Sequence, residues 1–496
     1  MISFRNFLKA TAAATVLLSL GACAQGPTVA PERVQAVLSK ADPEFLKAEI
    51  DLYVPMTDEE IAAKFTQPTL SQLLARAMNS KQVEQSLYGI GSGHAAVGQT
   101  MATGAMQATI NGSIGAKDNS GQTDTKYYEQ LGPQWSFQVF DGGSKDARID
   151  RDRAKTAQTF FEHNGNVQDI GLVAFENAKD VERHRERVAK VSKIADEARK
   201  LTTKVLSKVK AGYSPESELF KARGEIKDVE TKLELAKKEL AFSSISWRSK
   251  AGFDLPEGVV DDTTSLKMAD GFRVELVRRN HPRIKALQAV GQATINETKA
   301  VEAEVFGNFG LSYSPLLIAM SGAANPISLV TTAIQYQNKS LMDGGDRNSR
   351  LLKVIYQFQA IAAGLEHLYS KVDEAVEQAL SAREHDMRAA KLAREAADLQ
   401  QRAYKAKLAE YDIIGGSVSD LITALQATMA AELAAIDAET RAELADARVA
   451  AAQGEFIERL GIMRSVKMSV TSDADLNIDQ FVPGKGKSVE QASQAQ

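Results

Sequence analysis

The sequence predicts a mainly α-helical protein with a small β part, built from two copies of one unit. The tripeptide Asp-Gly-Gly occurs twice, about 200 positions apart, at Asp141, Gly142, Gly143 and at Asp343, Gly344, Gly345. Each copy follows an alternating apolar stretch and precedes a very long helical pattern. Aromatic residues make up only 6% of the chain, which favours long helices joined by shallow seams over one thick core. We therefore expect a duplicated unit that holds a hairpin and long helices.

The N-terminus has the pattern of an export signal over residues 1–22. Arg5 and Lys9 precede an apolar stretch at 10–20 that is too short to span a bilayer. The stretch ends in Leu-Gly-Ala-Cys23, which resembles the lipobox of bacterial lipoproteins, whose cysteine is lipidated and becomes the mature N-terminus. A signal-peptidase site of the Ala-x-Ala type that removes Cys23 is the alternative. Cys23 is the only cysteine, so no intramolecular disulfide is possible.

The first unit is expected over residues 69–250. It opens with a helical apolar face. From residue 107, polar and apolar residues alternate, which predicts a strand with one wet face. We place the two strands of this hairpin at about 105–115 and 133–140, with a polar loop between them. A proline-free helical run then covers 145–210, and a second helix follows a break rich in Gly, Ser and Pro.

The second unit, expected over residues 272–456, repeats this order. Its strands are placed at about 305–318 and 327–342. A heptad seam of apolar residues follows from Val354 and predicts the second long helix. The remaining parts are an N-terminal segment, a linker between the units and a partly disordered tail, at residues 23–68, 251–271 and 457–496.

Each long helix is predicted to end at a tight turn. In the first turn Gly212 suits a helix C-terminus and Ser214 suits the N-cap of the next helix. In the second turn Gly415 and Gly416 stop the helix, and Ser417 begins a capping-box pattern. At the Asp-Gly-Gly sequences the aspartate is expected to cap a helix while the glycines turn the chain.

The helix lengths predict how the helices pack. A helix over 145–210 would measure about 99 Å at 1.5 Å per residue. In each unit the helix before the hairpin and the helix after the turn together match the long helix in length. Two short helices can therefore stack end to end beside one long helix. This arrangement gives a coiled-coil wall about 100 Å tall, with the linker and terminal segments at mid-height.

The predicted strands suit a membrane barrel shared between copies. Two hairpins give four strands, too few to close a barrel, and unpaired strand edges favour pairing with another chain. Strands with one polar and one apolar face suit a barrel with a wet lumen. No run of about 18 apolar residues follows the export signal, so we expect no membrane-spanning helix. Three copies would supply twelve strands and close the helical walls into a tube.

This order of elements resembles the TolC family of outer-membrane efflux and secretion channels, over about residues 69–456. The family's strand-to-helix turn is similar to 139–143 and 341–345, and its helix-to-helix turn is similar to 212–219 and 415–421. The chain departs from the family at the second helix-to-helix turn, which is one residue short. Tyr213 and Gly416 also stand where efflux members often carry Arg or Leu.

The resemblance implies a lipid-anchored homotrimer in the outer membrane, with a 12-stranded barrel that continues into a helical periplasmic tunnel. Such a protein is a passive conduit of a tripartite efflux or type I secretion system. Its partners are a periplasmic adaptor (membrane fusion protein) and an inner-membrane pump. Acidic residues after the helix-to-helix turns ring the periplasmic entrance in this family, and they match Glu218 and Asp420 here. For Asp420, a capping box with Ser417 is the alternative.

Composition and motifs argue against several other functions. A net charge of −4 and a pI near 6.0 give no sign of a nucleic-acid partner. The histidines share no metal-ligand spacing, and no nucleotide-binding or triad motif occurs. We therefore expect no metal, no cofactor and no enzymatic activity. The alternative function is a periplasmic coiled-coil adaptor or a structural tether lipoprotein, which would lack the duplicated hairpins.

Overall fold

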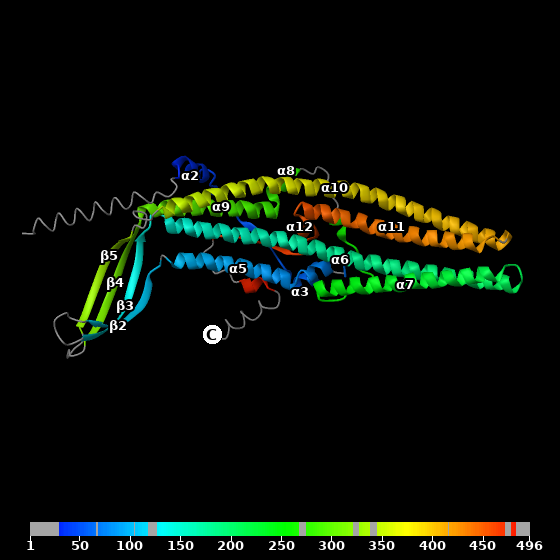
Figure 1. Ribbon diagram of the computed structural model, residues 1–496, viewed down its shortest axis with the longest axis horizontal. Helices are drawn as coiled ribbons and strands as arrows, with labels where there is room; N and C mark the ends of the chain where they lie inside the picture. Colours follow the sequence, from blue (N-terminus) through cyan, green and yellow to red (C-terminus); the bar gives the residue numbers. More distant parts are fainter. Residues whose placement is uncertain are drawn as a thin grey trace, which may run out of the picture.

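The computed structural model describes residues 29–65, 68–103, 105–117, 126–266, 274–320, 327–337, 345–414, 416–471 and 478–482. These residues form a long, narrow helical body with a small sheet at one end and two helix-to-helix turns at the other (Figure 1). Among the residues singled out from the sequence, Cys23, Asp343, Gly344 and Gly415 lie outside the described residues.

Two helices run the length of the body. They are α6 (Ser144–Lys210) and α10 (Asp346–Ile414), which have 67 and 69 residues. In the half next to the sheet, α5 (Lys81–Ala102) packs on α6, and α9 (Pro282–Ala303) contacts both long helices. The short helices therefore lie beside the long ones, as their lengths predicted.

The same arrangement holds in the half away from the sheet. There α7 (Glu216–Ala251) packs on α6, while α11 (Val418–Ala452) contacts α10 and α6. Four helices thus lie side by side at each level (Figure 1). The two outer edges of this wall are α5 with α7 on one side and α10 on the other.

Each helix that precedes a hairpin is interrupted once. Before α5, the short helix α4 (Leu70–Ala77) ends, and the Ser80 side chain caps the new helix by accepting from Val83 N–H at 3.5 Å. Before α9, the helix α8 (Val274–Asn280) ends at His281, because Pro282 lacks an N–H and fits only the first turn of a new helix.

The four hairpin strands form one antiparallel sheet in the order β2-β3-β4-β5. Their bounds are β2 Gln107–Lys117, β3 Lys126–Phe140, β4 Asn308–Met320 and β5 Ile327–Gln337. β3 begins seven residues before its predicted start, because Tyr127 and Tyr128 continue the ladder opposite Ala116 and Gly115. β4 begins at 308 and not 305, because Glu304–Phe306 form a 3-10 turn that Gly307 ends with φ 66°.

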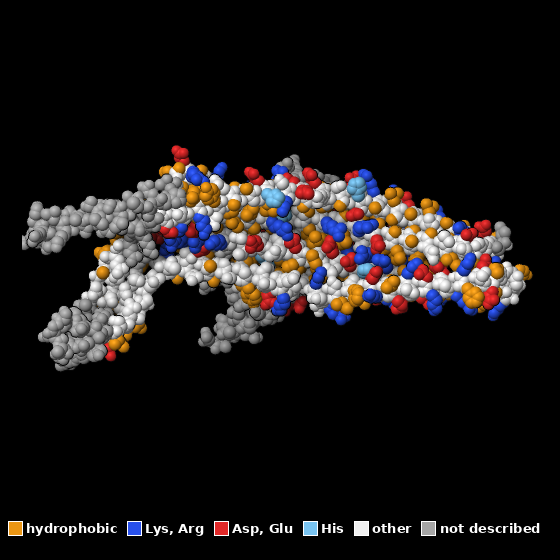
Figure 2. Space-filling view, viewed as in Figure 1, with side chains coloured by type: hydrophobic (Ala, Val, Ile, Leu, Met, Phe, Trp, Pro, Cys, Tyr) orange, Lys and Arg blue, Asp and Glu red, His pale blue; other side chains and the backbone are white. Residues whose placement is uncertain are grey.

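The two faces of this sheet differ in chemistry, most clearly in the half next to the helices, because the register places Leu316, Ile318, Ile327 and Leu329 on the otherwise polar face in the far half. The register places apolar residues of all four strands on one face, where all but the half-buried Trp135 are exposed: Ile110, Ile114, Leu131, Trp135, Phe309, Leu311, Tyr313, Leu317, Val330, Ile334 and Tyr336. The other face carries small and amide side chains such as Thr109, Asn111, Gln134, Ser136 and Gln335. Within the described strands the charged residues are Lys117, Lys126 and Glu129, at the end away from the helices. Figure 2 accordingly shows charge spread over the helical body and largely missing from the described part of the sheet.

The largest core lies at mid-height, and it includes residues that the sequence analysis assigned to a tail. β1 (Ile50–Val54) pairs antiparallel with β6 (Arg464–Met468). α12 (Phe456–Leu460) packs on α6, where a Cβ at Gly171 would lie 2.7 Å from Ile457 Cδ1. The sequence analysis predicted a partly disordered tail over 457–496, with the terminal segments at mid-height; within it, apolar residues of 457–471 and 478–482 bury against this core.

Among the described helices, α11 has the length and composition of a possible membrane span, which the sequence analysis did not expect. Half of its most apolar window is buried in the structure. The buried residues pack against α10 and α6, so contacts inside the helical body account for its apolar character.

Candidate functional site

The two helix-to-helix turns lie together at the end of the body opposite the sheet (Figure 1). In the first turn, Gly212 has φ 74°, and its N–H donates to the Val209 carbonyl at 3.0 Å. The N–H of Tyr213 donates to the Lys208 carbonyl at 2.9 Å. This is a Schellman motif, in which a left-handed glycine ends the helix as predicted.

The next helix begins differently from the prediction. Pro215, with an extended backbone, is the N-cap of α7, so the predicted N-cap Ser214 stands one residue outside. The Ser214 hydroxyl instead donates to the Glu218 carboxylate. Glu218 is thereby held at the turn and does not extend freely into solvent.

The second turn lacks the predicted capping box. Ser417 is the N-cap of α11, but its side chain accepts no capping hydrogen bond. Asp420 is exposed, and the described part of the chain offers it no hydrogen bond or ion pair. A capping box uses Glu or Gln at this position, and the shorter Asp420 does not reach the Ser417 N–H. Gly416 lies against the backbone of Tyr411, with a Cβ position 3.8 Å from Tyr411 Cα.

The two turns are tied together by side chains that the sequence analysis did not single out. Lys204 Nζ lies 2.7 Å from Asp412 Oδ2. Lys208 Nζ donates to the Tyr411 carbonyl at 2.5 Å and lies 3.8 Å from the centroid of the Tyr411 ring. A lysine here stabilises the last carbonyls of α10 and the negative end of its dipole. We call Lys204, Lys208, Tyr411 and Asp412 the tip latch.

Glu218 is close to this latch, whereas Asp420 is not. Tyr411 is only 2% exposed. Burial and the nearby Glu218 carboxylate raise the pKa of the Tyr411 hydroxyl. The structure therefore brings Glu218, Ser214 and Tyr411 together and leaves Asp420 on the outside of α11.

Farther from the tip, a buried carboxylate lies between the same two helical hairpins. Gln426 Nε2 on α11 donates to Glu225 Oε2 on α7 at 2.7 Å. Glu225 is 6% exposed, and its other oxygen is buried without a hydrogen-bond partner. Burial and the nearby Asp228 raise the pKa of Glu225, against the hydrogen bond from Gln426 and the charge of Lys232.

One sequence signal could have located the latch. Ala397, Tyr404 and Tyr411 are seven residues apart and all buried, so the heptad seam of α10 continues to the turn. An aromatic residue at the end of a heptad seam indicates that another helix packs over that residue. The lysines gave no comparable signal, because lysines are frequent along both long helices.

The strand-to-helix turn at the other end of α6 matches its predicted role. The Asp141 carboxylate accepts from Gly143 N–H at 3.0 Å and from Lys145 N–H at 2.6 Å, so it caps α6. Gly142 and Gly143 have φ 69° and 87°, and Gly345 of the second copy has φ 89°. A Cβ at Gly142 would lie 2.8 Å from the Ala303 carbonyl. Asp141 and its two glycines therefore shape the passage from strand to helix.

The described residues contain no group of three or more His, Cys, Asp or Glu side chains arranged to hold a metal ion. The distinctive features are therefore the amphipathic sheet at one end of the molecule and, at the other end, the two turns joined by the tip latch.

Comparison with known proteins identifies the fold. No protein-family model matches the chain, and no curated protein matches it. Among solved structures, CusC is similar with a TM-score of 0.70 and 16% identity, over 78% of this chain and 92% of CusC. The CusC structures concern folding and the formation of a transmembrane channel. The Campylobacter jejuni outer membrane channel CmeC is similar with a TM-score of 0.68 and 11% identity, over 91% of this chain and 95% of CmeC. The open state of the Neisseria gonorrhoeae outer membrane channel MtrE is similar with a TM-score of 0.65 and 13% identity, over 79% of this chain and 90% of MtrE. The chain has the fold of the TolC-type outer-membrane channels.

Proposed function

We propose that this protein is the outer-membrane channel component of a tripartite efflux or type I secretion system. It is a passive conduit and not an enzyme. One observation carries the proposal: a sheet with an exposed apolar face, on which Glu129 at the end away from the helices is the one charged residue of the described strands, and a polar face continues into a helical wall that is open at both edges. A wall of this kind is complete only as part of a closed tube in a membrane.

The apolar face of the sheet supports a lipid environment. Ile110, Ile114 and Ile334 are 78%, 81% and 80% exposed. Burying one such side chain is worth about 1.5–3 kcal/mol, so exposure of the whole face to water would be costly. Toward the helices, Phe309 and Tyr336 have ring centroids 4.5 Å apart and lie on the same face. Aromatic residues at this level suit the membrane–water interface.

The open edges support a ring of identical copies. Among the described strands, β2 and β5 each pair on one side only. Below them, α7 exposes the apolar side chains of Phe220, Leu235, Phe242 and Ile245, and α10 exposes those of Leu392, Leu399 and Ile413. The α10 residues are spaced by multiples of seven, as in a coiled-coil seam. One edge of each copy can therefore meet the other edge of the next, which is a contact that closes into a ring.

We propose three copies, because three sheets of this kind supply a 12-stranded barrel. Strands alternate in direction around the ring, since β5 of one copy and β2 of the next run antiparallel. An even strand number of this size is usual for outer-membrane barrels. The amide and hydroxyl face then lines the lumen.

The N-terminal segment supports a lipid anchor at Cys23. α2 (Pro31–Leu38) packs through Val34 and Val37 against Ile295 and Ile355, near the sheet end of α9 and α10. Ile355 is about 14 Å along α10 from its start. The six residue-to-residue steps from Cys23 to Val29 can span about 20 Å. A lipid on Cys23 would therefore reach the bilayer that holds the sheet.

The tip latch supports a gate at the periplasmic entrance. The turns shaped by Gly212, Ser214, Gly416 and Ser417 would close the tunnel, with Glu218 and Asp420 as candidate gate carboxylates. Docking of the adaptor and pump would separate the hairpins and break the latch. In this proposal the pump supplies the energy, since the sequence carries no nucleotide-binding motif.

Release of a small polar dye from liposomes tests this function. The purified, full-length protein is reconstituted into dye-loaded vesicles, with a latch variant to favour the open state. We expect dye release that depends on the latch variant, together with a heat-labile trimer on a gel. A properly folded trimer that retains all dye in both forms would contradict the proposal.

A further inference from the structure

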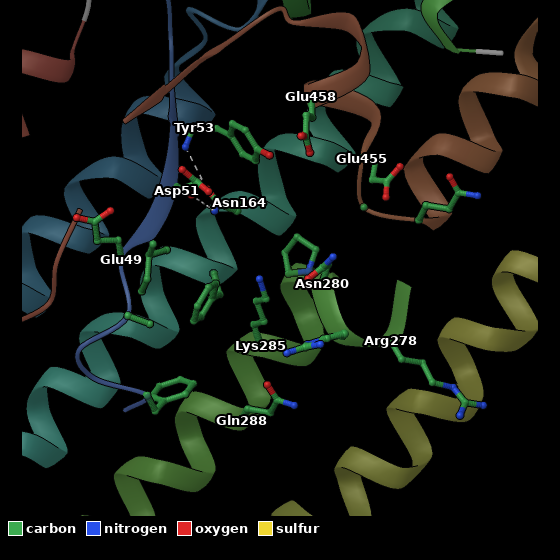
Figure 3. A pocket seen from close by; sticks show the side chains of 18 of the residues that line it. Glu49, Asp51, Tyr53, Asn164, Arg278, Asn280, Lys285, Gln288, Glu455 and Glu458 are labelled. Atoms are coloured by element: carbon green, nitrogen blue, oxygen red, sulfur yellow. Dashed lines mark hydrogen bonds between the residues drawn. The ribbon is translucent and has the colours of Figure 1, made fainter. Parts of the chain in front are cut away.

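A cleft of about 1070 Å³ opens at mid-height, away from both the sheet and the tip latch. Its walls come from parts of the chain that are far apart in sequence (Figure 3). They are the segment around β1, the end of α8 with the first turn of α9, and α12. The channel function described above assigns no role to this space.

One wall of the cleft is basic, and two of its cationic side chains lack counter-ions among the described residues. Lys285, on the first turn of α9, is half-buried, and its ammonium lies 5.9 Å from the centroid of the Phe161 ring. Burial lowers the pKa of Lys285, Arg279 lowers it further, and Asp51 opposes both. Neither Lys285 nor Arg279 forms an ion pair with any residue that the structure describes. Arg278, in contrast, forms an ion pair with Asp373 on α10.

The opposite wall is acidic. Figure 3 shows Glu455 and Glu458 across the cavity from Lys285, with Asp51 and Tyr53 beside them on β1. Burial and the carboxylates of Glu458, Asp51 and Glu455 raise the pKa of Tyr53 to about 12. Glu455 forms an ion pair with Arg459 at 2.7 Å, whereas Glu458 forms none within the described part of the chain. Glu458 is therefore, together with Asp51, an acidic group of this wall that has no ion pair among the described residues.

An apolar surface connects the two walls. The rings of Phe45 and Phe161 lie 6.5 Å apart, and Ile50 and Pro282 line the same cavity. A ligand that spans the cleft would therefore meet cations at one end, carboxylates at the other and apolar side chains between them, with Asp42, Glu44 and Glu49 along the segment that carries Phe45 and Ile50.

We infer that this cleft binds a short zwitterionic peptide. Its carboxylate would lie against Lys285 and Arg279, its amine against Glu458, and its side chains against Phe45 and Phe161. The volume is that of a typical small-ligand pocket at its upper range, so three or four residues fit. A polyanion would be repelled by the acidic wall. Because Lys285 and Glu458 are on separate elements, a bound peptide would also tie these elements together.

Three related probes test the inference on the intact, purified protein. They are trialanine, N-acetyl-trialanine, which lacks the amine charge, and trialanine amide, which lacks the carboxylate. We expect trialanine to bind by ligand-observed NMR and to raise the thermal midpoint. Each blocked form should bind about tenfold more weakly, because each loses one charge-assisted contact. Equal binding of the three probes, or no binding of trialanine, would overturn the inference.

Two substitutions assign the ends of the ligand. Lys285→Met should abolish the preference for trialanine over its amide while keeping the preference over the acetylated form. Glu458→Gln should do the reverse. Lys299→Met, at an exposed lysine of the same helix outside the cleft, is the matched control and should change neither. If Lys285→Met leaves both preferences intact, the basic wall does not hold the carboxylate. These readouts do not depend on channel activity, so they stand or fall separately from the proposed conduit.

Discussion

The two ends of this molecule are held together in opposite ways. At the sheet end, the described strands are almost free of charge, and broad apolar surface is exposed. At the tip, a few charged and aromatic side chains of the same chain tie the turns to each other. The sheet therefore depends on surroundings that one copy does not supply, namely lipid and other copies. The tip holds itself through contacts worth about 1 kcal/mol each, which a docking partner can break.

The largest effect is expected on the sheet face that we assign to lipid. Ile110→Lys places a charge on the apolar face, where it costs about 2–4 kcal/mol near the middle of a bilayer. We expect loss of folded protein from the outer-membrane fraction. Thr109→Lys is the control, because the neighbouring residue points to the polar face and should be tolerated. Equal loss in the two variants would mean that the faces are assigned wrongly.

The junction between the two ends gives the next effect. Gly142→Ala combines φ 69° with a Cβ position 2.8 Å from the Ala303 carbonyl. We expect destabilisation of about 2–3 kcal/mol, read from chemical or thermal unfolding. Gly143→Ala is a graded control, since φ is 87° but nothing lies within 4 Å of the added Cβ. It should cost about 1 kcal/mol; a larger cost there would show that backbone strain alone governs the turn.

At the tip, a single lysine should control how often the turns separate. Lys208→Met keeps the apolar stem but removes the contact with the Tyr411 carbonyl and ring. A loss of about 1–1.5 kcal/mol corresponds to about tenfold faster amide hydrogen exchange around the two turns. Lys210→Met, at an exposed lysine two residues on, is the control. Unchanged exchange in Lys208→Met would exclude this latch.

The smallest effect is a pH dependence at Glu225. Its folded pKa is raised above the ordinary 4.5. Protonated Glu225 therefore contributes stability that is complete below pH 4.5 and is lost as the pH rises through the folded pKa. We expect Glu225→Gln to raise the thermal midpoint at pH 8, by the equivalent of about 1 kcal/mol, and to change it little at pH 4.

Glu230 supplies a control of opposite sign on the same helix. Hydrogen bonds from Lys227 and Arg199 lower the pKa of Glu230. Its contribution is therefore present above the unfolded pKa and lost as the pH falls, so Glu230→Gln should destabilise at pH 8 and not at pH 4. If both variants shift the thermal midpoint in the same direction, burial does not explain the raised pKa of Glu225.

Much of the fold could be predicted from sequence because it repeats. The two Asp-Gly-Gly sequences, the heptad seams and the alternating strands are local patterns, and they located the long helices, the hairpins and the Gly212 turn. The latch could not be predicted in this way. Lys208 meets Tyr411 across 203 positions, and only the packing of two hairpins brings them together. The terminal segments were expected at mid-height, but the pairing of β1 with β6 was missed, because the two strands are more than 400 residues apart in sequence.

The most direct test of the conduit is single-channel conductance in planar bilayers, with the wild-type trimer compared with Lys208→Met. Our account predicts a mostly closed wild-type channel and a variant of the same trimer that is open about ten times more often. It also predicts an unchanged fully open conductance, because the latch lies far from the sheet. A folded Lys208→Met trimer that inserts into the bilayer but passes no current would contradict the account.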